Sequence, residues 1–160
     1  MKKLICLVAL LLTAQAFGET VETYAEPTGF AVYYIQDEAE CSESGGIWDS
    51  EVCLVQDENK LTLTKSEGTD SKVTKVNIST WGGNAHSCDF TSTNVYNVGT
   101  ALKVVEPVEI YEFGSQEHKL GLCEVTLTKT ETGYSVDNNG NCNYFCGMRA
   151  WLYIENATKK

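Results

Sequence analysis

The chain has 160 residues and a formal net charge of −10, with 22 acidic against 12 basic side chains. A surface this acidic repels nucleic acid and anionic lipid, so the composition argues against both as partners and favours a cationic one. Acidic surfaces also keep exported proteins soluble, which is the plainer interpretation of the same charge.

The first 18 residues have the pattern of a secretory signal peptide. Lys2 and Lys3 precede an apolar run from 4 to 12, and small residues follow up to Gly18. The run is too short to span a bilayer, and no later segment is apolar enough to do so. We therefore expect cleavage of 1–18 and a periplasmic or secreted mature protein, whose net charge becomes −12 when the two lysines are removed.

The mature chain is long enough for one domain with its own core. Residues 19–29 are polar and contain Pro27 and Gly29, so we expect a flexible N-terminal arm there. A single β-domain is predicted over 30–155, followed by a polar tail, 156–160. Aromatic and β-branched residues at 30–35 indicate a first strand, and a short helix running on into 36–40 is the alternative.

Six cysteines remain after the leader, because the seventh, Cys6, lies inside it. An even number in an exported chain indicates three disulfides, for which fifteen pairings exist. Cys41 and Cys53 enclose a Gly-Gly turn, where positive φ costs little, and Trp48, which can cover a bridge. We therefore predict that this pair closes a small lobe, 41–53.

Metal and catalytic chemistry have little support in the sequence. There is no Cys-x-x-Cys pair, and the acid-rich stretch 37–58 lacks the residue spacing of a calcium loop. His86 and Ser87 are adjacent, but neighbouring side chains on a strand point to opposite faces, and no nucleophile elbow is present. We therefore expect no metal, no cofactor and no catalytic residue, and hence a protein that is not an enzyme.

From residue 60 onward the hydrophobic period is two, which is typical of β-strands. Leu61 and Leu63 alternate with polar residues, as do Val76 and Ile78, and the turn at 67–70 makes these two segments a hairpin. Further strands are predicted from similar patterns near 88–90, 101–105, 108–113, 120–128 and 134–136.

The last predicted strand places Met148, Ala150, Leu152 and Ile154 on one face. About eight strands without a helical period predict an all-β domain, either a compact antiparallel barrel or a sandwich. We favour the barrel because the first and last strands are both apolar enough to need neighbours.

Two aromatic groups are the candidate binding residues. Trp81 and His86 flank a glycine-rich break, and Arg149, Trp151 and Tyr153 share the second face of the last strand. A surface patch of Arg, Trp and Tyr has the composition of a binding hot spot. The alternative is that the rings pack under a loop while Arg149 pairs with a carboxylate.

Several motifs resemble a family of small exported, disulfide-bearing β-domains of Gram-negative bacteria. They are Asn84-Ala85-His86-Ser87-Cys88-Asp89-Phe90, a mid-chain Cys123 that opens a strand, and the Cys-Gly-x-Arg-Ala segment within 142–150. Members are similar to periplasmic lysozyme-inhibitor-type domains, which are small β-barrels. The resemblance implies an envelope binding protein with a cationic lysozyme as its partner.

Within this framework Cys88 and Cys123 are both predicted on inward faces, so we expect them to pair across strands. Cys142 and Cys146 then close the loop before the last strand. The swapped pairings of these four cysteines remain open, because a sequence does not fix connectivity.

The sequence is compatible with three classes of function. The first is an acidic binding protein of the lysozyme-inhibitor type. The second is a small-molecule or glycan-binding barrel that uses Trp81, Trp151 and tyrosines, for which an apolar cavity would be evidence. The third is an envelope structural or assembly protein without a pocket.

Overall fold

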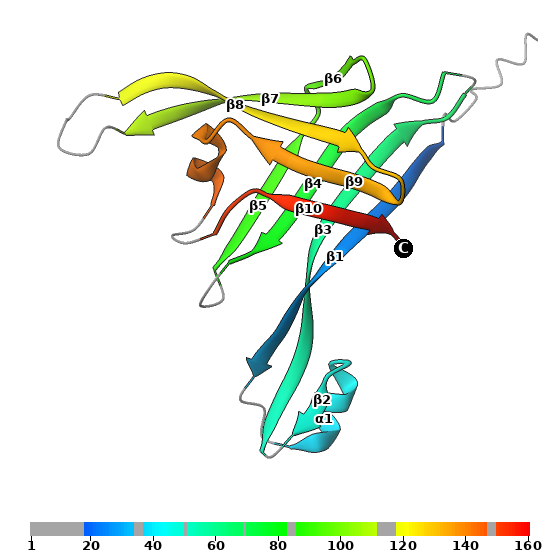
Figure 1. Cartoon of the computed structure of the whole chain (residues 1–160), viewed down its shortest axis with the longest axis vertical. Helices are drawn as coiled ribbons and strands as arrows, with labels where there is room; N and C mark the ends of the chain where they lie inside the picture. The colour runs from blue at the N-terminus through cyan, green and yellow to red at the C-terminus, as the bar shows by residue number, and fades with distance from the viewer. Residues whose placement is uncertain are drawn as a thin grey trace, which may run out of the picture.

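A computed structural model describes residues 18–33, 37–49, 51–68, 70–82, 86–111, 118–146 and 150–160. It shows an antiparallel sheet of ten strands that nearly closes into a barrel, stapled by three disulfides (Figure 1). The predicted all-β class and disulfide-stapled barrel are confirmed, with two strands more than the sequence indicated. No helix among the described residues is long and apolar enough to cross a membrane.

The strands run in the order β5-β4-β3-β1-β10-β9-β8-β7-β6, so the first and last strands of the chain are neighbours in the middle of the sheet; β2 pairs with β3 off this path. Their bounds are β1 Glu19–Tyr33, β2 Ile47–Asp49, β3 Val52–Ser66, β4 Val73–Trp81, β5 Ser87–Ser92, β6 Val95–Val98, β7 Ala101–Tyr111, β8 His118–Lys129, β9 Gly133–Asn138 and β10 Ile154–Lys159. The helices are α1 Glu38–Glu43 and the 3₁₀-helix η2 Asn141–Phe145.

The alternation of side chains along the strands fills the barrel interior. Alternate residues are buried in the barrel part of β3, β4, β5 and β8, at 59–63, 76–80, 88–92 and 123–127, as the period of two predicted. Phe90, the largest fully buried side chain, meets the ring of Phe145 edge to face at a centroid distance of 5.4 Å. The main members of this core are Leu61, Leu63, Val76, Ile78, Phe90, Val104, Val125, Leu127, Val136, Leu152 and Ile154.

The prediction of a flexible arm at 19–29 is wrong, because this segment is the first part of β1. It pairs with β3 along its length, and at Tyr24 and Ala25 also with β10. Pairing with neighbouring strands supplies main-chain hydrogen bonds, and these leave no recognisable pattern in a polar sequence. The expected polar tail, 156–160, likewise lies mostly in β10, where Ala157 is fully buried.

Three other boundaries also differ from the prediction. Residues 150–153 precede the last strand, which begins only at Ile154. The two strands predicted at 101–105 and 108–113 are one strand, β7, that continues through Pro107. β6 pairs only with 101–104, so one edge of β7 is open at Pro107, where a missing N–H is tolerated. A helix does form, but it begins at Glu38, capped by the Asp37 carboxylate.

The Cys41–Cys53 disulfide is present as predicted and joins α1 to β3. The pairs Cys88–Cys123 and Cys142–Cys146 are wrong: the bonds are Cys88–Cys146 and Cys123–Cys142. Cys88 is on β5 and Cys123 on β8, which are never neighbours in the sheet. η2 lies between these strands, and one cysteine at its start and one just after its end bond to β8 and β5 respectively.

This arrangement closes the seam of the barrel, which lies between the outer strands β5 and β6. Cys142 at the start of η2 is bound to β8, and Cys146, just after η2, is bound to β5. On the same seam the hydroxyl of Ser92 donates to the Glu106 carboxylate at 2.5 Å. Covalent and polar links therefore replace the missing ladder of main-chain hydrogen bonds.

An ion cluster ties the central strands together on the inner face of the sheet, next to the core residues Leu61 and Leu63. The carboxylate of Glu22 on β1 accepts from Lys65 on β3 at 2.6 Å and from Lys159 on β10 at 2.9 Å. The Tyr24 hydroxyl donates to the same carboxylate at 2.9 Å. These donors, Lys65 first, lower the pKa of Glu22 to about 2, whereas burial and the neighbouring carboxylate raise the pKa of Tyr24.

Candidate ligand-binding groove

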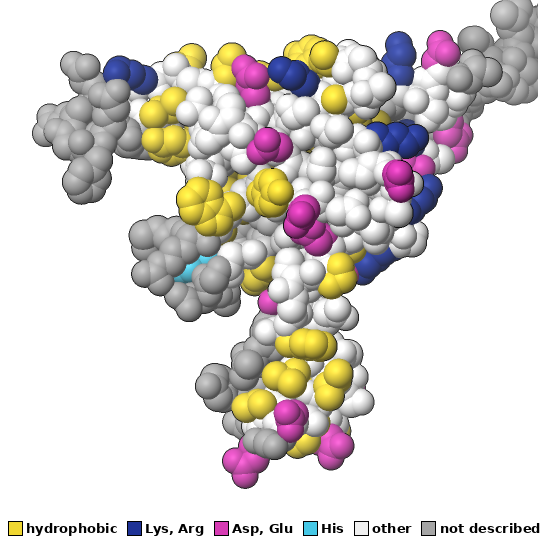
Figure 2. Space-filling model, viewed as in Figure 1, with side chains coloured by type: hydrophobic (Ala, Val, Ile, Leu, Met, Phe, Trp, Pro, Cys, Tyr) yellow, Lys and Arg dark blue, Asp and Glu magenta, His cyan; other side chains and the backbone are white. Residues whose placement is uncertain are grey.

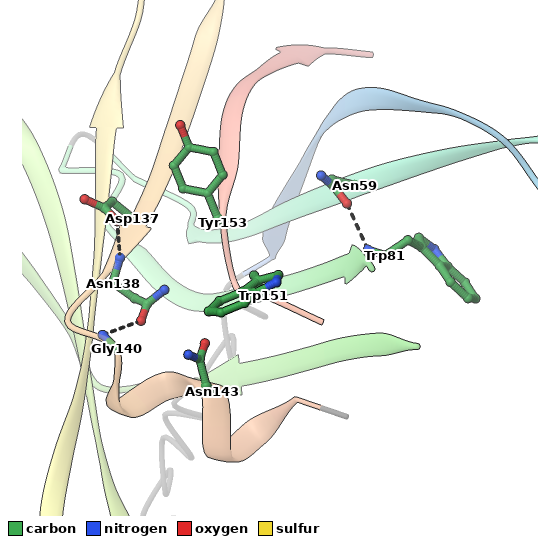
Figure 3. A pocket seen from close by; sticks show the side chains of 8 residues that line it. All are labelled: Asn59, Trp81, Asp137, Asn138, Gly140, Asn143, Trp151 and Tyr153. Atoms are coloured by element: carbon green, nitrogen blue, oxygen red, sulfur yellow. Dashed lines mark hydrogen bonds between the residues drawn. The ribbon is translucent and has the colours of Figure 1, made fainter. Parts of the chain in front are cut away.

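A groove of about 510 Å³ opens where the segment 150–153 passes between β4 and β9 (Figure 3). Its volume is within the range of small-molecule sites. Trp151 is 65% exposed and Tyr153 is 51% exposed, so two large rings remain in contact with water. The lining residues are Asn59, Trp81, Asp137, Asn138, Gly140, Asn143, Trp151 and Tyr153.

Alternation within the segment 150–153 directs these two rings outward. Ala150, Leu152 and Ile154 are buried in the barrel core, so Trp151 and Tyr153 must face the other way. The faces predicted from the sequence are therefore right for these residues, although the segment is not a strand. Tyr153 N donates to the carbonyl of Trp151 at 2.9 Å, which turns the chain toward β10.

Two side chains from neighbouring strands hold the segment in place. The Thr80 hydroxyl, on β4, donates to the carbonyl of Trp151 at 2.7 Å. The side-chain amide of Asn138, on β9, donates to the carbonyl of Leu152 at 2.8 Å. Thr80 is only 1% exposed, so water does not compete for its bond. The main chain that carries the Trp151 ring is thus fixed from both sides of the groove.

Asn59 and Asn138 are committed to the framework of the groove. The Asn59 amide donates to Glu26 at 2.9 Å and its oxygen accepts the main-chain N–H of Trp81 at 2.9 Å. The Asn138 oxygen accepts from Gly140 N at 2.7 Å, closing a turn in which Gly140 has a φ of +85°. Because each of these two side-chain amides already uses its donor and its acceptor within the protein, both serve to hold the walls of the groove in shape.

Asn143 and Asp137 differ because they keep hydrogen-bonding capacity. The side-chain oxygen of Asn143 is buried and has no hydrogen-bond partner in the described part of the chain. Leaving such a group unsatisfied costs roughly 1–3 kcal/mol. Asp137 is exposed, and one carboxylate oxygen accepts only from Asn138 N at 2.8 Å within the described residues. In Figure 3 Asn143 lies beside the Trp151 ring, whereas Asp137 lies farther from it, beyond Asn138.

The structure brings together three of the five residues predicted for binding. Trp81, Trp151 and Tyr153 line the groove, although the Trp81 ring points away from Trp151 (Figure 3). Trp81 also lines an adjoining hollow of about 300 Å³ together with Phe30. His86 is not among the lining residues of either; its carbonyl accepts from Gly82 N at 2.7 Å. Arg149 lies outside the described residues, as do 1–17 of the leader.

Sequence reasoning missed the polar half of the groove. Residues 137–141, Asp-Asn-Asn-Gly-Asn, were visible only as a turn, and a run rich in asparagine was the one available signal. Asn59 and Asn143 carried no signal, since both depend on tertiary contacts. Within the described residues, no group of three or more His, Cys, Asp or Glu side chains is placed to hold a metal ion.

No family model, curated protein or solved structure matches this chain. The features of this chain that bear on function are its groove, its charge and its disulfides. Three disulfides are typical of proteins that mature in an oxidising compartment. The resemblance to lysozyme-inhibitor-type domains stays a prediction.

Proposed function

We propose that this is an exported binding protein whose groove takes one ring of a neutral saccharide. The observation that carries the proposal is the pair of exposed rings, Trp151 and Tyr153, set beside the hydrogen-bonding groups of Asn143 and Asp137. A pyranose has an apolar face of C–H groups and a rim of hydroxyls. The rings suit the face, and the exposed Asp137 carboxylate can accept from a hydroxyl of the rim.

Electrostatics favour a neutral ligand over an anionic one. Asp137 faces the groove, Arg149 is the only arginine of the chain, and the net charge is −10. An acidic sugar or a phosphate would be repelled by this field. A hydroxyl donor meets no such penalty, since the exposed Asp137 carboxylate can accept from it.

The groove is also prepared before a ligand arrives. Thr80 and Asn138 fix the main chain that carries Trp151, and the walls are braced by Asn59. A site that does not reorganise loses less entropy on binding. The barrel interior is filled by its own core, so the ligand site belongs to the outer groove.

The test uses the mature chain, 19–160, titrated with tetrasaccharides of N-acetylglucosamine, cellobiose-type glucose and maltose-type glucose. Calorimetry and tryptophan fluorescence report binding. We expect one of them to bind, and Trp151→Ala and Tyr153→Ala each to weaken it by about tenfold or more, equivalent to about 1.4 kcal/mol. Trp48→Phe, in the distant lobe, is the matched control. Absence of binding by all three, or equal loss in the control, contradicts the proposal.

A second candidate function is binding of a cationic lysozyme, and the charge favours it. The mature net charge of −12 would attract a basic enzyme, raising the association rate at low salt. Titration against c-, g- and i-type lysozymes in a wall-lysis assay tests it. Stoichiometric, salt-sensitive inhibition of one type supports this candidate, and no inhibition discards it. A constitutive homo-oligomer on a sizing column would instead favour an envelope assembly role.

A further inference from the structure

The ribbon of β1 and β3 continues beyond the barrel into a protruding lobe (Figure 1). We define the lobe as residues 30–33, 37–49 and 51–56. It contains a three-stranded sheet in which β2 pairs with β3 and β3 pairs with β1. α1 covers one face, held there by the fully buried Cys41–Cys53 disulfide.

The second face of this sheet is apolar. Cys53 points toward α1, so its neighbours Val52 and Leu54 point to the opposite side. Ile47 pairs with Leu54, and Phe30 pairs with Gln56, two residues further on the same side. We call Phe30, Ile47, Val52 and Leu54 the open lobe face.

No described element covers the open lobe face. Ile47 is 58% exposed and Phe30 is 56% exposed, while Val52 and Leu54 are half-buried. A contiguous apolar surface of this kind on a protruding element is typical of an interaction site. The open lobe face belongs to a sheet that a disulfide links to α1, so we expect its main chain to be rigid.

The charge of the lobe has one sign. Asp49 lies on the open lobe face, two residues after Ile47, and Glu51 follows in the turn between β2 and β3. Four more exposed acidic residues belong to the α1 side of the lobe: Asp37, Glu38, Glu40 and Glu43. The sequence has no lysine or arginine between Lys3 and Lys60. Figure 2 accordingly shows hydrophobic and acidic side chains over the lobe in view, and no basic ones.

We propose that the open lobe face docks a basic protein surface. An apolar side chain of the partner packs on Ile47 and Leu54, and its lysines or arginines are attracted by Asp49 on this face and by the acidic lobe as a whole. Charge complementarity selects this occupant, because a second copy of the lobe, nucleic acid and anionic lipid would all bring like charge to the lobe. The proposal goes beyond the groove and stands whether or not the groove binds a saccharide.

The test uses the mature protein and three labelled peptides: an alternating Leu-Lys peptide, a Ser-Lys peptide of equal charge and a Leu-Glu peptide. Anisotropy at low and moderate salt gives affinities. We expect the Leu-Lys peptide to bind, the Ser-Lys peptide to bind about tenfold more weakly, and the Leu-Glu peptide not to bind. Equal binding of the two basic peptides would reduce the lobe to a nonspecific acidic surface and overturn the proposal.

Variants locate the site. Phe30→Ser with Ile47→Ser should weaken Leu-Lys binding about tenfold, whereas Val21→Ser, a change at an exposed apolar residue of the barrel, should not.

A triple variant of the lobe, Glu38→Gln with Glu40→Gln and Glu43→Gln, should flatten the salt dependence of binding. The matched barrel triple is Glu19→Gln, Glu131→Gln and Glu155→Gln, all exposed. Equal effects of lobe and barrel variants would overturn the assignment, as would a dimer on a sizing column that Ile47→Ser dissolves.

Discussion

The buried hydroxyl of Thr80 donates to the main-chain carbonyl of Trp151, 71 residues later in the sequence, over 2.7 Å. This bond joins the inner side of β4 to the segment that carries the exposed ring. The ring itself is held by almost no packing, so its position depends on the main chain beneath it. A residue outside the groove therefore controls the geometry of the groove.

Thr80→Val should remove this bond while keeping the side-chain shape. Because the Trp151 carbonyl then loses a buried donor, we expect a loss of about 1–2 kcal/mol in the free energy of unfolding. Amide hydrogen exchange at Leu152 and Tyr153 should accelerate more than exchange in β8. Thr80→Ser keeps the hydroxyl and is the control. Equal exchange in the Val and Ser variants would show that the bond does not fix the segment.

Glu22 gives a prediction about acid. Its pKa falls from the ordinary 4.5 to about 2 because Lys65 and Lys159 bind the charged form. Above pH 4.5 the stabilisation is fully present, and it is lost as pH falls toward 2, since the unfolded chain takes up the proton first. Glu22→Gln should cost about 1 kcal/mol at pH 7 and flatten the fall in Tm below pH 4.5. Glu19→Gln, exposed on the same strand, is the control; an unchanged pH profile in Glu22→Gln would contradict the prediction.

Removal of the seam disulfide and removal of the lobe disulfide should differ in their effect on the stability of the barrel. Replacing Cys88 and Cys146 by serine opens a link across 58 residues, and chain entropy alone predicts a loss of about 4 kcal/mol in unfolding free energy. Replacing Cys41 and Cys53 should loosen the lobe and leave the guanidinium midpoint of the barrel nearly unchanged. Non-reducing peptide mass spectrometry checks the pairing. Equal losses in the two variants would show that the seam link contributes no special stability.

Two glycines on the barrel make a matched pair. A Cβ at Gly133 would lie 1.9 Å from the main-chain oxygen of Ala157, which cannot move without breaking the β9–β10 pairing. A Cβ at Gly121 would overlap no main chain but the Ile110 side chain, which can change rotamer, and would be in ordinary contact with the Asn141 amide. Gly133→Ala should therefore cost about 3 kcal/mol, and Gly121→Ala distinctly less. Denaturant unfolding ranks them, and the reverse order would contradict the packing of β9 on β10.

The parts of the fold that sequence predicted are those where one face of a strand is buried. Leu61 and Leu63 or Val125 and Leu127 alternate with polar residues because the barrel has one wet side. The first part of β1 was not predicted as a strand because only Tyr24 and Ala25 are buried there. Its main-chain hydrogen bonds come from partners far away in the sequence. Pairing of that kind leaves no local pattern.

The candidate groove likewise contains some residues that the sequence predicted and others that it did not. Trp151 and Tyr153 were predictable, since their outward direction follows from the burial of Leu152 and Ile154. Asn59, Asn138 and Asn143 were not, because an asparagine in a turn and one that braces a wall look alike in sequence. Their roles depend on Trp81, Leu152 and the groove itself, which only the folded chain brings near.

The two barrel disulfides are nested: Cys123–Cys142 lies inside the loop that Cys88–Cys146 closes. If the chain is exported with its N-terminus first, Cys88 and Cys123 enter the oxidising compartment before either of their native partners. An oxidase acting on cysteines in order of appearance would join these two, which is also the pair that the sequence analysis predicted. Native connectivity would then require thiol–disulfide exchange, so we expect a disulfide isomerase, more than an oxidase, to set the yield of this protein.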